Sequence, residues 1–323
     1  MHDQGPTIVV PSNTTVYLAG GAVVKSTLSG DRADNVRIAG RGVLYQPARG
    51  LEITFSKHIE IDGIAVINPN HYVIYGGQSQ RVTIRNVKAF SSSKWSDGID
   101  LMSCSDVDVV GVFLRTSDDC IAIYGHRWEF YGDAANINIQ DSTLGTDVAY
   151  PINVGTHGNP DRPETIECIA VHNVDILNHD EPQLGYQGCI ALNASDSNLI
   201  RNVRVEDVRI DDFERDQLLN TRVTFNKKYA TAPGRGIEDV RFKNVYYAGR
   251  HAEVSIIAGY DATRSVRNVV FENLSICGQL IWDGMEGKPR HFQTSDLARV
   301  FIGEHVGGVQ FIRREGATSG QTC

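Results

Sequence analysis

Three aspartates occur in two short acidic motifs that lie about one structural repeat apart. Asp97 precedes the apolar run that begins at Gly98, and Asp118 and Asp119 precede the run that begins at Cys120. Like charges that lie close together raise one another's proton affinity, so one carboxyl group stays protonated while another is ionised. Cleavage of a glycosidic bond needs such a set: an acid for the leaving oxygen and a base for the attacking water.

Each of these aspartates, taken alone, has a simpler structural explanation. Asp and Asn often cap turns, because their side chains accept hydrogen bonds from nearby backbone N–H groups. Three carboxylates that face one another across a single rung are harder to explain as caps. The chemistry therefore depends on whether the chain contains elements that stack the two motifs.

A short phrase recurs along the chain, in which an Asn or Asp is usually followed by alternating apolar residues. The phrase begins at residues 35, 58, 81, 106, 136, 168, 202, 239, 268 and 308. Alternation is the period of a half-buried strand, and a strand-rich period of this length is typical of a solenoid. A β-sandwich with evenly spaced strands is the alternative, but a sandwich does not usually repeat one phrase. We therefore predict an all-β fold, a single-stranded right-handed parallel β-helix of about ten coils that spans residues 1–323 as one domain.

Four turns align by the strands that follow them, which begin at residues 98, 120, 151 and 189. In each run the second and fourth residues are aliphatic and should point into the core, which leaves the first and third outside. The alignment predicts one row of equivalent turn positions, formed by Asp97, Asp119, Tyr150 and Gly188. It predicts a second, outward row of Asp100, Ala122, Asn153 and Ala191, and it places His126 and His157 in register just past the strands. The predicted cleft is lined by Asp97, Asp100, Asp118, Asp119, Asn153, His126 and His157.

Long loops are predicted on the same side of the coils, near residues 124–135, 179–187 and 214–236. Aromatic and Arg side chains on loops beside a rigid scaffold suit a sugar site, because ring faces stack on pyranose faces. The candidates for substrate binding are Trp95, Arg127, Tyr150 and Tyr186. Trp128 and Tyr131 are explained equally well by packing of their loop onto the coils.

The two motifs, SDGID at 96–100 and SDDCIAI at 117–123, resemble the acidic motifs of the glycoside hydrolase family 28 polygalacturonases. They are also similar to those of the related family 49, the dextranases and isopullulanase. The resemblance implies an inverting hydrolase in which Asp118 is the general acid and Asp97 and Asp119 hold the nucleophilic water. It also implies an extracellular or periplasmic location. We expect no cofactor and no metal, because the aspartates do the acid–base work and no ligand cluster is spaced for Ca²⁺ or Zn²⁺.

Two departures from the polygalacturonase pattern bear on the substrate. Those enzymes carry Gly-His-Gly before the third aligned strand, where this chain has Ala149-Tyr150-Pro151. They also carry Arg-Ile-Lys in the next coil to bind the substrate carboxylate, and the alignment puts Ile190 and Leu192 at the positions of those cations. The departures favour a neutral sugar polymer, as in the dextranases, over galacturonan.

Other substrates and activities remain open at this point. A polygalacturonase-type activity is the first alternative, with Arg127, or Arg222 and Lys227 from a later loop, binding the acidic group. A polysaccharide lyase with this fold would need a cation for the uronic acid and a basic Arg or Lys near the cleft. A non-catalytic carbohydrate-binding β-helix explains the coils and the aromatic loops but not three facing carboxylates.

Composition argues against two kinds of partner, and the partner that we expect is the polysaccharide or oligosaccharide substrate that the resemblance implies. The net charge of −8 disfavours a nucleic-acid surface, which would carry a basic stripe. The sequence contains no apolar run long enough to span a membrane, and its six cysteines have no metal-ligand spacing. The first residues have no signal-peptide pattern and enter the first coil at once, so we expect a leader or an N-terminal domain to precede them in the natural protein. Oligomeric state is not predicted.

Overall fold

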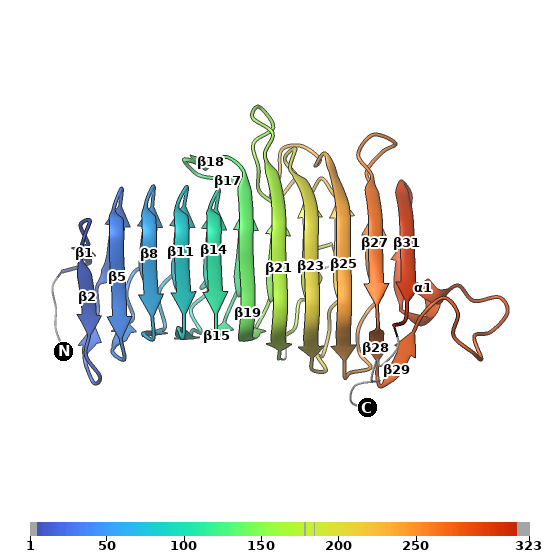
Figure 1. The fold of residues 1–323 in the computed structure, drawn as a ribbon, viewed down its shortest axis with the longest axis horizontal. Coiled ribbons are helices and arrows are strands. Elements are labelled where there is room, and N and C mark those ends of the chain that lie inside the picture. The colour runs from blue at the N-terminus through green and yellow to red at the C-terminus, as the bar shows by residue number, and fades with distance from the viewer. Residues whose placement is uncertain (1–4, 178, 184, 315–323) are drawn as a thin grey trace.

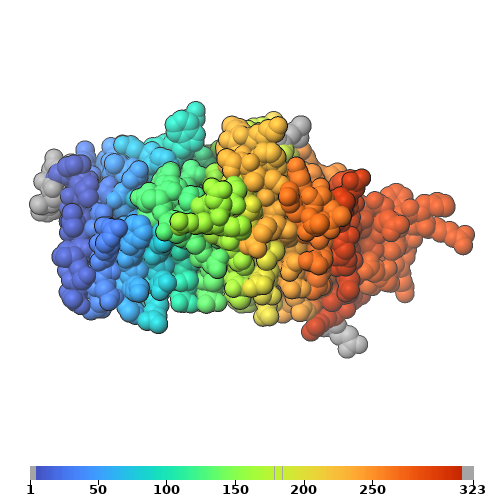
Figure 2. All heavy atoms as spheres, turned by 90° about the horizontal axis from the view of Figure 1, so that it is seen from above, coloured from blue at the N-terminus to red at the C-terminus, as the bar shows by residue number. Residues whose placement is uncertain are grey.

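The computed structural model describes residues 5–177, 179–183 and 185–314. These residues form a right-handed parallel β-helix whose coils stack along one axis in sequence order (Figures 1 and 2). The predicted fold class is therefore confirmed. Because every inner strand pairs with the coil before it and the coil after it, buried sheet edges are avoided along the length of the solenoid.

One sheet carries the strands that follow the acidic turns, and we call it the aspartate sheet. Its eleven strands are β1 (Thr7–Val9), β4 (Thr27–Asp31), β7 (Leu51–Thr54), β10 (Ile74–Gly77), β13 (Ile99–Met102), β16 (Ile121–Tyr124), β20 (Ile152–Gly155), β22 (Ile190–Ala194), β24 (Leu219–Val223), β26 (Ser255–Ala258) and β30 (Val300–Ile302). All neighbouring pairs in this sheet are parallel.

The second sheet forms the opposite side of the coils and contains eighteen strands. They are β2 (Thr15–Leu18), β3 (Val23–Val24), β5 (Asp34–Gly40), β6 (Val43–Tyr45), β8 (Lys57–Asp62), β9 (Ala65–Ile67), β11 (Gln80–Arg85), β12 (Lys88–Phe90), β14 (Ser105–Val110), β15 (Phe113–Thr116), β19 (Ala134–Thr146), β21 (Thr165–Ile176), β23 (Leu199–Ile210), β25 (Gly236–Tyr247), β27 (Val266–Glu272), β28 (Leu274–Ile276), β29 (Gln279–Ile281) and β31 (Val306–Ile312). The remaining elements are a short hairpin, β17 (His126–Arg127) with β18 (Phe130–Tyr131), and one helical turn, α1 (Thr294–Leu297).

Each of the ten predicted phrases lies in a strand of this second sheet. The residue that opens the phrase has a positive φ in coil after coil, for example Asn136 (φ 56), Asn202 (φ 55) and Asn268 (φ 56). Asn and Asp tolerate this left-handed conformation better than most residues. Their side chains also bond from coil to coil, as when Asn136 Nδ2 donates to Asp106 Oδ1 at 2.9 Å. The recurring Asn or Asp is thus explained by backbone conformation.

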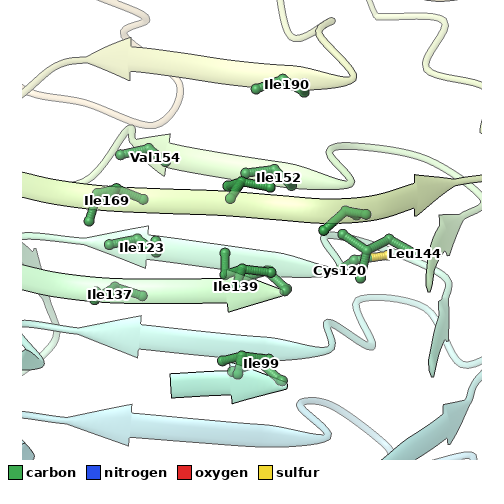
Figure 3. Packing of buried hydrophobic residues seen from close by; sticks show 14 of the residues in the cluster. Ile99, Cys120, Ile123, Ile137, Ile139, Leu144, Ile152, Val154, Ile169 and Ile190 are labelled. Carbon is green, nitrogen blue, oxygen red and sulfur yellow. The ribbon is translucent and has the colours of Figure 1, made fainter. Parts of the chain in front are cut away.

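The core holds the register of the aspartate sheet. Ile99, Ile121, Ile152 and Ile190 are paired directly in successive strands, and all are at most 1% exposed. Figure 3 shows such residues filling the space between the two sheets. Full burial of one such side chain is worth about 1.5–3 kcal/mol. A slip of one residue would turn this row outward, so the turns before the strands are fixed relative to one another.

The predicted loops are partly wrong. The segment 214–236 is not one loop, because Leu219–Val223 forms strand β24 with Leu219 and Val223 buried in the core. The segment 124–135 contains the β17–β18 hairpin. Residues 179–183 and 185–187 lie between β21 and β22, as expected, and residue 184 lies outside the described residues. No helix among the described residues has the length and apolar character needed to cross a membrane.

Candidate active site

The structure confirms the predicted register of the acidic turns. Asp100 pairs with Ala122, which pairs with Asn153, which pairs with Ala191. The backbone N–H of Gly98 donates to Asp119 O at 2.8 Å, so the turns of Asp97 and Asp119 lie in adjacent coils. The two motifs, more than one strand apart in sequence, are therefore brought together by the stacking of coils.

The prediction that the first residue of each run faces outward is wrong. Cys120 and Cys189 are fully buried in the core. The strands begin one residue later, at Ile121 and Ile190, so the first position belongs to the corner of the coil and does not follow the alternation of the strand.

A cavity of about 500 Å³ lies at the acidic turns. It is lined by His71, Tyr72, Trp95, Asp97, Asp118, Asp119, Tyr124, Arg127, Val148, Ala149, His157, Glu181, Gln183, Tyr186, Lys228 and Tyr229. Of the predicted site residues, the three aspartates that are predicted to be catalytic line this cavity, together with Trp95, Arg127, His157 and Tyr186. Its size is in the range of about 300–1,000 Å³ that is usual for small-ligand sites.

Four predicted site residues do not line the cavity. Asp100 and Asn153 are fully buried in the outward row of the aspartate sheet. Tyr150 is 1% exposed and packs on Tyr186 with ring centroids 4.5 Å apart. His126 lies in the hairpin, where it pairs with Tyr131, and it is not among the residues that line the cavity.

Of the three aspartates that line the cavity, Asp119 accepts the most hydrogen bonds. Its Oδ1 accepts from the Tyr150 N–H at 2.9 Å, and its Oδ2 accepts from Asn153 Nδ2 at 2.9 Å and from Tyr124 OH at 3.3 Å. Burial raises the pKa of Asp119 to about 7, the nearby Asp118 charge adds to the rise, and the hydrogen bonds oppose it. Donors of this kind stabilise the ionised form, which suits a base.

Asp118 is half-buried and faces the cavity. Its Oδ1 accepts the Asp119 backbone N–H at 3.0 Å. Burial raises its pKa, while that hydrogen bond and the Arg127 charge oppose the rise. A carboxyl group that keeps its proton to a higher pH and can reach a ligand is suited to act as a general acid.

Asp97 lies in the other acidic turn, and Asp100 lies in strand β13, which follows it. Burial raises the pKa of Asp97 well above its usual value, and the charges of Asp100, Asp119 and Asp118 raise it further. Asp100 is 0% exposed, and neither of its carboxyl oxygens accepts a hydrogen bond from an N–H group, so its polar neighbour is the carboxyl group of Asp97. Burial and the Asp119 charge raise the pKa of Asp100 well above its usual value. We therefore expect Asp100 to be neutral, because an unpaired buried charge is very costly.

Replacement of Asp100 by Asn should stabilise the protein near pH 7. The raised pKa means that Asp100 favours folding at low pH, and this contribution is lost as pH rises above its unfolded pKa of about 3.9 toward its folded value. Asn cannot ionise. The change Asp100→Asn should therefore raise the free energy of unfolding by roughly 1–3 kcal/mol more at pH 7 than at pH 4. Urea unfolding at both pH values measures this, with Asp108→Asn on the opposite sheet as the control. An equal effect at both pH values would contradict the neutral state of Asp100.

Arg127 is a half-buried cation of the cavity. Its Nη1 contacts His157 Nε2, and its Nε has no hydrogen-bond partner. Burial, followed by the Arg127 charge, lowers the pKa of His157 to about 3, so His157 is a neutral acceptor at working pH. Within the part of the chain that the structure describes, Arg127 forms no ion pair with a carboxylate. Its charge acts at longer range on the carboxyl groups of Asp97 and Asp100.

Sequence reasoning missed several residues of the cavity wall. Lys228, not its neighbour Lys227, lines the cavity, and its Nζ donates to Gln183 Oε1 at 2.9 Å. His71 also lines the cavity and lies 4.0 Å from the Tyr72 ring, with its Nδ1 unpaired. The adjacent pair Lys227 and Lys228 in a long predicted loop was a sequence signal for Lys228. No sequence signal pointed to His71.

The structure also corrects the argument about missing cations. Ile190 and Leu192 face the core, so they cannot occupy the places of cleft cations. The outward positions of β22 are Ala191 and Asn193, which carry no charge. In the parallel sheet Asn193 lies beside Arg222 of the next coil. The cations that line the cavity, Arg127 and Lys228, come from loops and not from β22.

The sequence profile of glycosyl hydrolases family 28 matches residues 7–283. This chain belongs to glycosyl hydrolases family 28. It is 22% identical to an exopolygalacturonase of Arabidopsis thaliana over 204 residues, which are 62% of this chain and 44% of that protein. It is 23% identical to an endo-polygalacturonase of Pectobacterium parmentieri over 238 residues, which are 72% of this chain and 54% of that protein. The chain thus spans about half the length of the curated relatives it matches.

Solved structures share the fold of this family 28 chain. The family 28 exopolygalacturonase of Yersinia enterocolitica matches with a TM-score of 0.64 at 13% identity, over 94% of this chain and 70% of that one. The exopolygalacturonase of Thermotoga maritima matches with a TM-score of 0.63 at 13% identity, over 97% and 85%. At identities this low the matches show that the β-helix fold is shared. They do not identify the substrate, which has to be inferred from the cavity.

Proposed function

We propose that this family 28 chain hydrolyses a uronic acid polysaccharide of the galacturonan type. One observation carries the proposal: three carboxylates share a cavity with Arg127 and Lys228. A guanidinium with no carboxylate partner is suited to bind the planar carboxylate of a uronic acid. The expectation of a neutral polymer rested on the absence of cations in one strand, and it gives no role to the cations of the loops. The polygalacturonase relatives favour galacturonan in the same way.

The mechanism that we propose is a single displacement with inversion at the anomeric carbon. Asp118 gives its proton to the leaving oxygen while Asp97 and Asp119 hold the attacking water and accept its proton. Burial raises the pKa of both Asp118 and Asp119, which favours the protonated acid at Asp118, while the hydrogen bonds that Asp119 accepts from Tyr150 and Asn153 oppose the rise and favour its ionised form. The activity rises with the fraction of molecules in which both conditions hold, so its pH dependence is bell-shaped.

The proposal is tested by product release from polygalacturonate beside neutral α-glucans, followed by NMR of the anomeric configuration in fresh product. Inverted product from polygalacturonate supports it, and hydrolysis of a neutral glucan alone would overturn the substrate. An unsaturated product that absorbs in the ultraviolet would instead identify a lyase. Binding without cleavage would identify a carbohydrate-binding β-helix. We also propose an extracellular or periplasmic site of action, where such polymers occur.

A further inference from the structure

The outward face of the aspartate sheet is buried. An open groove for a polymer would leave this face accessible to solvent. The outward row runs in direct pairing from β10 to β24 through Tyr75, Asp100, Ala122, Asn153, Ala191 and Asn220. Tyr75 is 7% exposed, and the other five are 0% exposed. Side chains that formed the floor of a groove for a polymer would be accessible. Other segments must therefore cover this face on both sides of the cavity.

The β17–β18 hairpin covers the coils on the N-terminal side. Phe130 is 1% exposed, its ring lies 5.3 Å from Phe55, and a Cβ at Gly77 would lie 2.5 Å from it. Trp128 meets the rings of Tyr72 and Tyr75 edge-on at 5.8 and 5.9 Å. Phe55 directly follows β7, so a hairpin that leaves the coil of β16 reaches back three coils, about 14 Å at the usual strand spacing. Figure 1 shows it over the earlier coils.

A second cover lies on the C-terminal side and comes from residues 185–187 and 224–230. Tyr186 packs on Tyr150 and stacks on Tyr229, with centroids 4.8 Å apart. From β24 below, Arg222 Nη2 donates to Gly185 O at 2.8 Å, and Asn220 Nδ2 donates to Gln187 O at 2.5 Å. These bonds join the loop to the outward face of β24, so the cover is fixed to the coil beneath it.

We infer that the cavity admits the ends of a polysaccharide chain and excludes its interior, so that the enzyme removes short saccharides from chain ends. This inference rests on the proposed function and adds to it the mode of attack. Along the solenoid axis the cavity is closed by the hairpin on one side and by the Tyr186–Tyr229 stack on the other. Trp95, which is 59% exposed, lies at the mouth. Its ring can stack on the sugar that remains outside.

Oligogalacturonides of one length, with free ends or with both ends blocked, test this inference on the unaltered protein. The blocked form carries an unsaturated sugar at the non-reducing end and an alditol at the reducing end. We expect cleavage of the free form to be about 10²-fold faster or more, because a misplaced end prevents reactive alignment. Equal rates would overturn the inference while supporting the proposed function. Cleavage of neither form would overturn the proposed function on which the inference rests.

A variant that uncovers the N-terminal coils gives a second test. Trp128→Ala with Phe130→Ala removes the two rings that cover Tyr75 and Gly77. We expect the viscosity of polygalacturonate to fall faster per bond cleaved, since uncovered coils accept chain interiors. Phe301→Ala is the matched control, because Phe301 is 58% exposed on the same sheet far from the cavity. An unchanged relation of viscosity to bonds cleaved, in a variant with native circular dichroism, would contradict the role of the hairpin.

Discussion

Replacement of Asp118 by Asn should lower kcat on the cleaved polysaccharide by about 10²-fold or more, the usual worth of a positioned general acid. Asn keeps the size and the acceptor oxygen that binds the Asp119 N–H, so the turn is preserved. What is lost is the proton that the leaving oxygen needs. The side chain is only half-buried, so the loss of activity should come without a loss of stability. Steady-state kinetics with urea unfolding separates the two effects.

The matched control for Asp118→Asn is Asp108→Asn. Asp108 lies on the opposite sheet, where its Oδ1 accepts from Asn138 Nδ2 at 2.9 Å. The same chemical change there should leave kcat within experimental error. Substrate affinity of Asp118→Asn should change little, because the acid acts on the leaving group in the transition state. Turnover within a few-fold of the natural protein would rule out Asp118 as the acid.

The fold was predictable because two local rules repeat in every coil. Alternation of apolar residues marks the strands, and an Asn or Asp occupies the left-handed position in six of the ten recurring phrases of the second sheet. The register then followed, since the pairing of Ile99 with Ile121 and Ile152 leaves no freedom to the turns before them. For this reason the sequence alone predicts that Asp97, Asp118 and Asp119 lie close together.

The loops were not predictable, because their positions depend on contacts between distant coils. His126 and His157 are equivalent in sequence register, yet the antiparallel β17–β18 pairing takes His126 out of the cavity. The hairpin is fixed by Phe130 against Phe55, a contact between residues 75 positions apart that no local pattern records. Lys228 belongs to the cavity for the same kind of reason, through Gln183 of another coil.

The outward side of the strands shows a further limit of pattern reading. Alternation says which residues leave the core, but it does not say whether solvent or another segment receives them. Asp100 was expected in the cleft because it faces outward, and it is instead fully buried. The segment 214–236 was expected to be a loop because its many polar residues obscure the pattern of strand β24. In the structure Asn220 and Thr221 of this strand are nevertheless buried.

Removal of the Arg127 charge should raise KM for oligogalacturonides by about 30-fold or more, because truncating one partner of a buried charge pair costs roughly 2–5 kcal/mol. Arg127→Gln keeps a donor for the His157 ring but cannot neutralise a carboxylate. The Arg127 charge also lowers the pKa of Asp118, so its removal should move the alkaline limb of activity, where the acid loses its proton, to higher pH. Kinetics on acidic and methyl-esterified oligomers across pH measures both effects.

Two comparisons make the Arg127 result decisive for the substrate. Arg127→Lys keeps the charge without the planar fork and should fall between the natural protein and Arg127→Gln. Arg162→Gln is the control, since Arg162 lies over Tyr131 on the outer side of the hairpin, away from the residues that line the cavity. The esterified substrate has no charge to lose, so its KM should hardly change. A rise in KM that is equal for acidic and esterified oligomers would show that Arg127 supports the shape of the cavity and does not recognise a carboxylate.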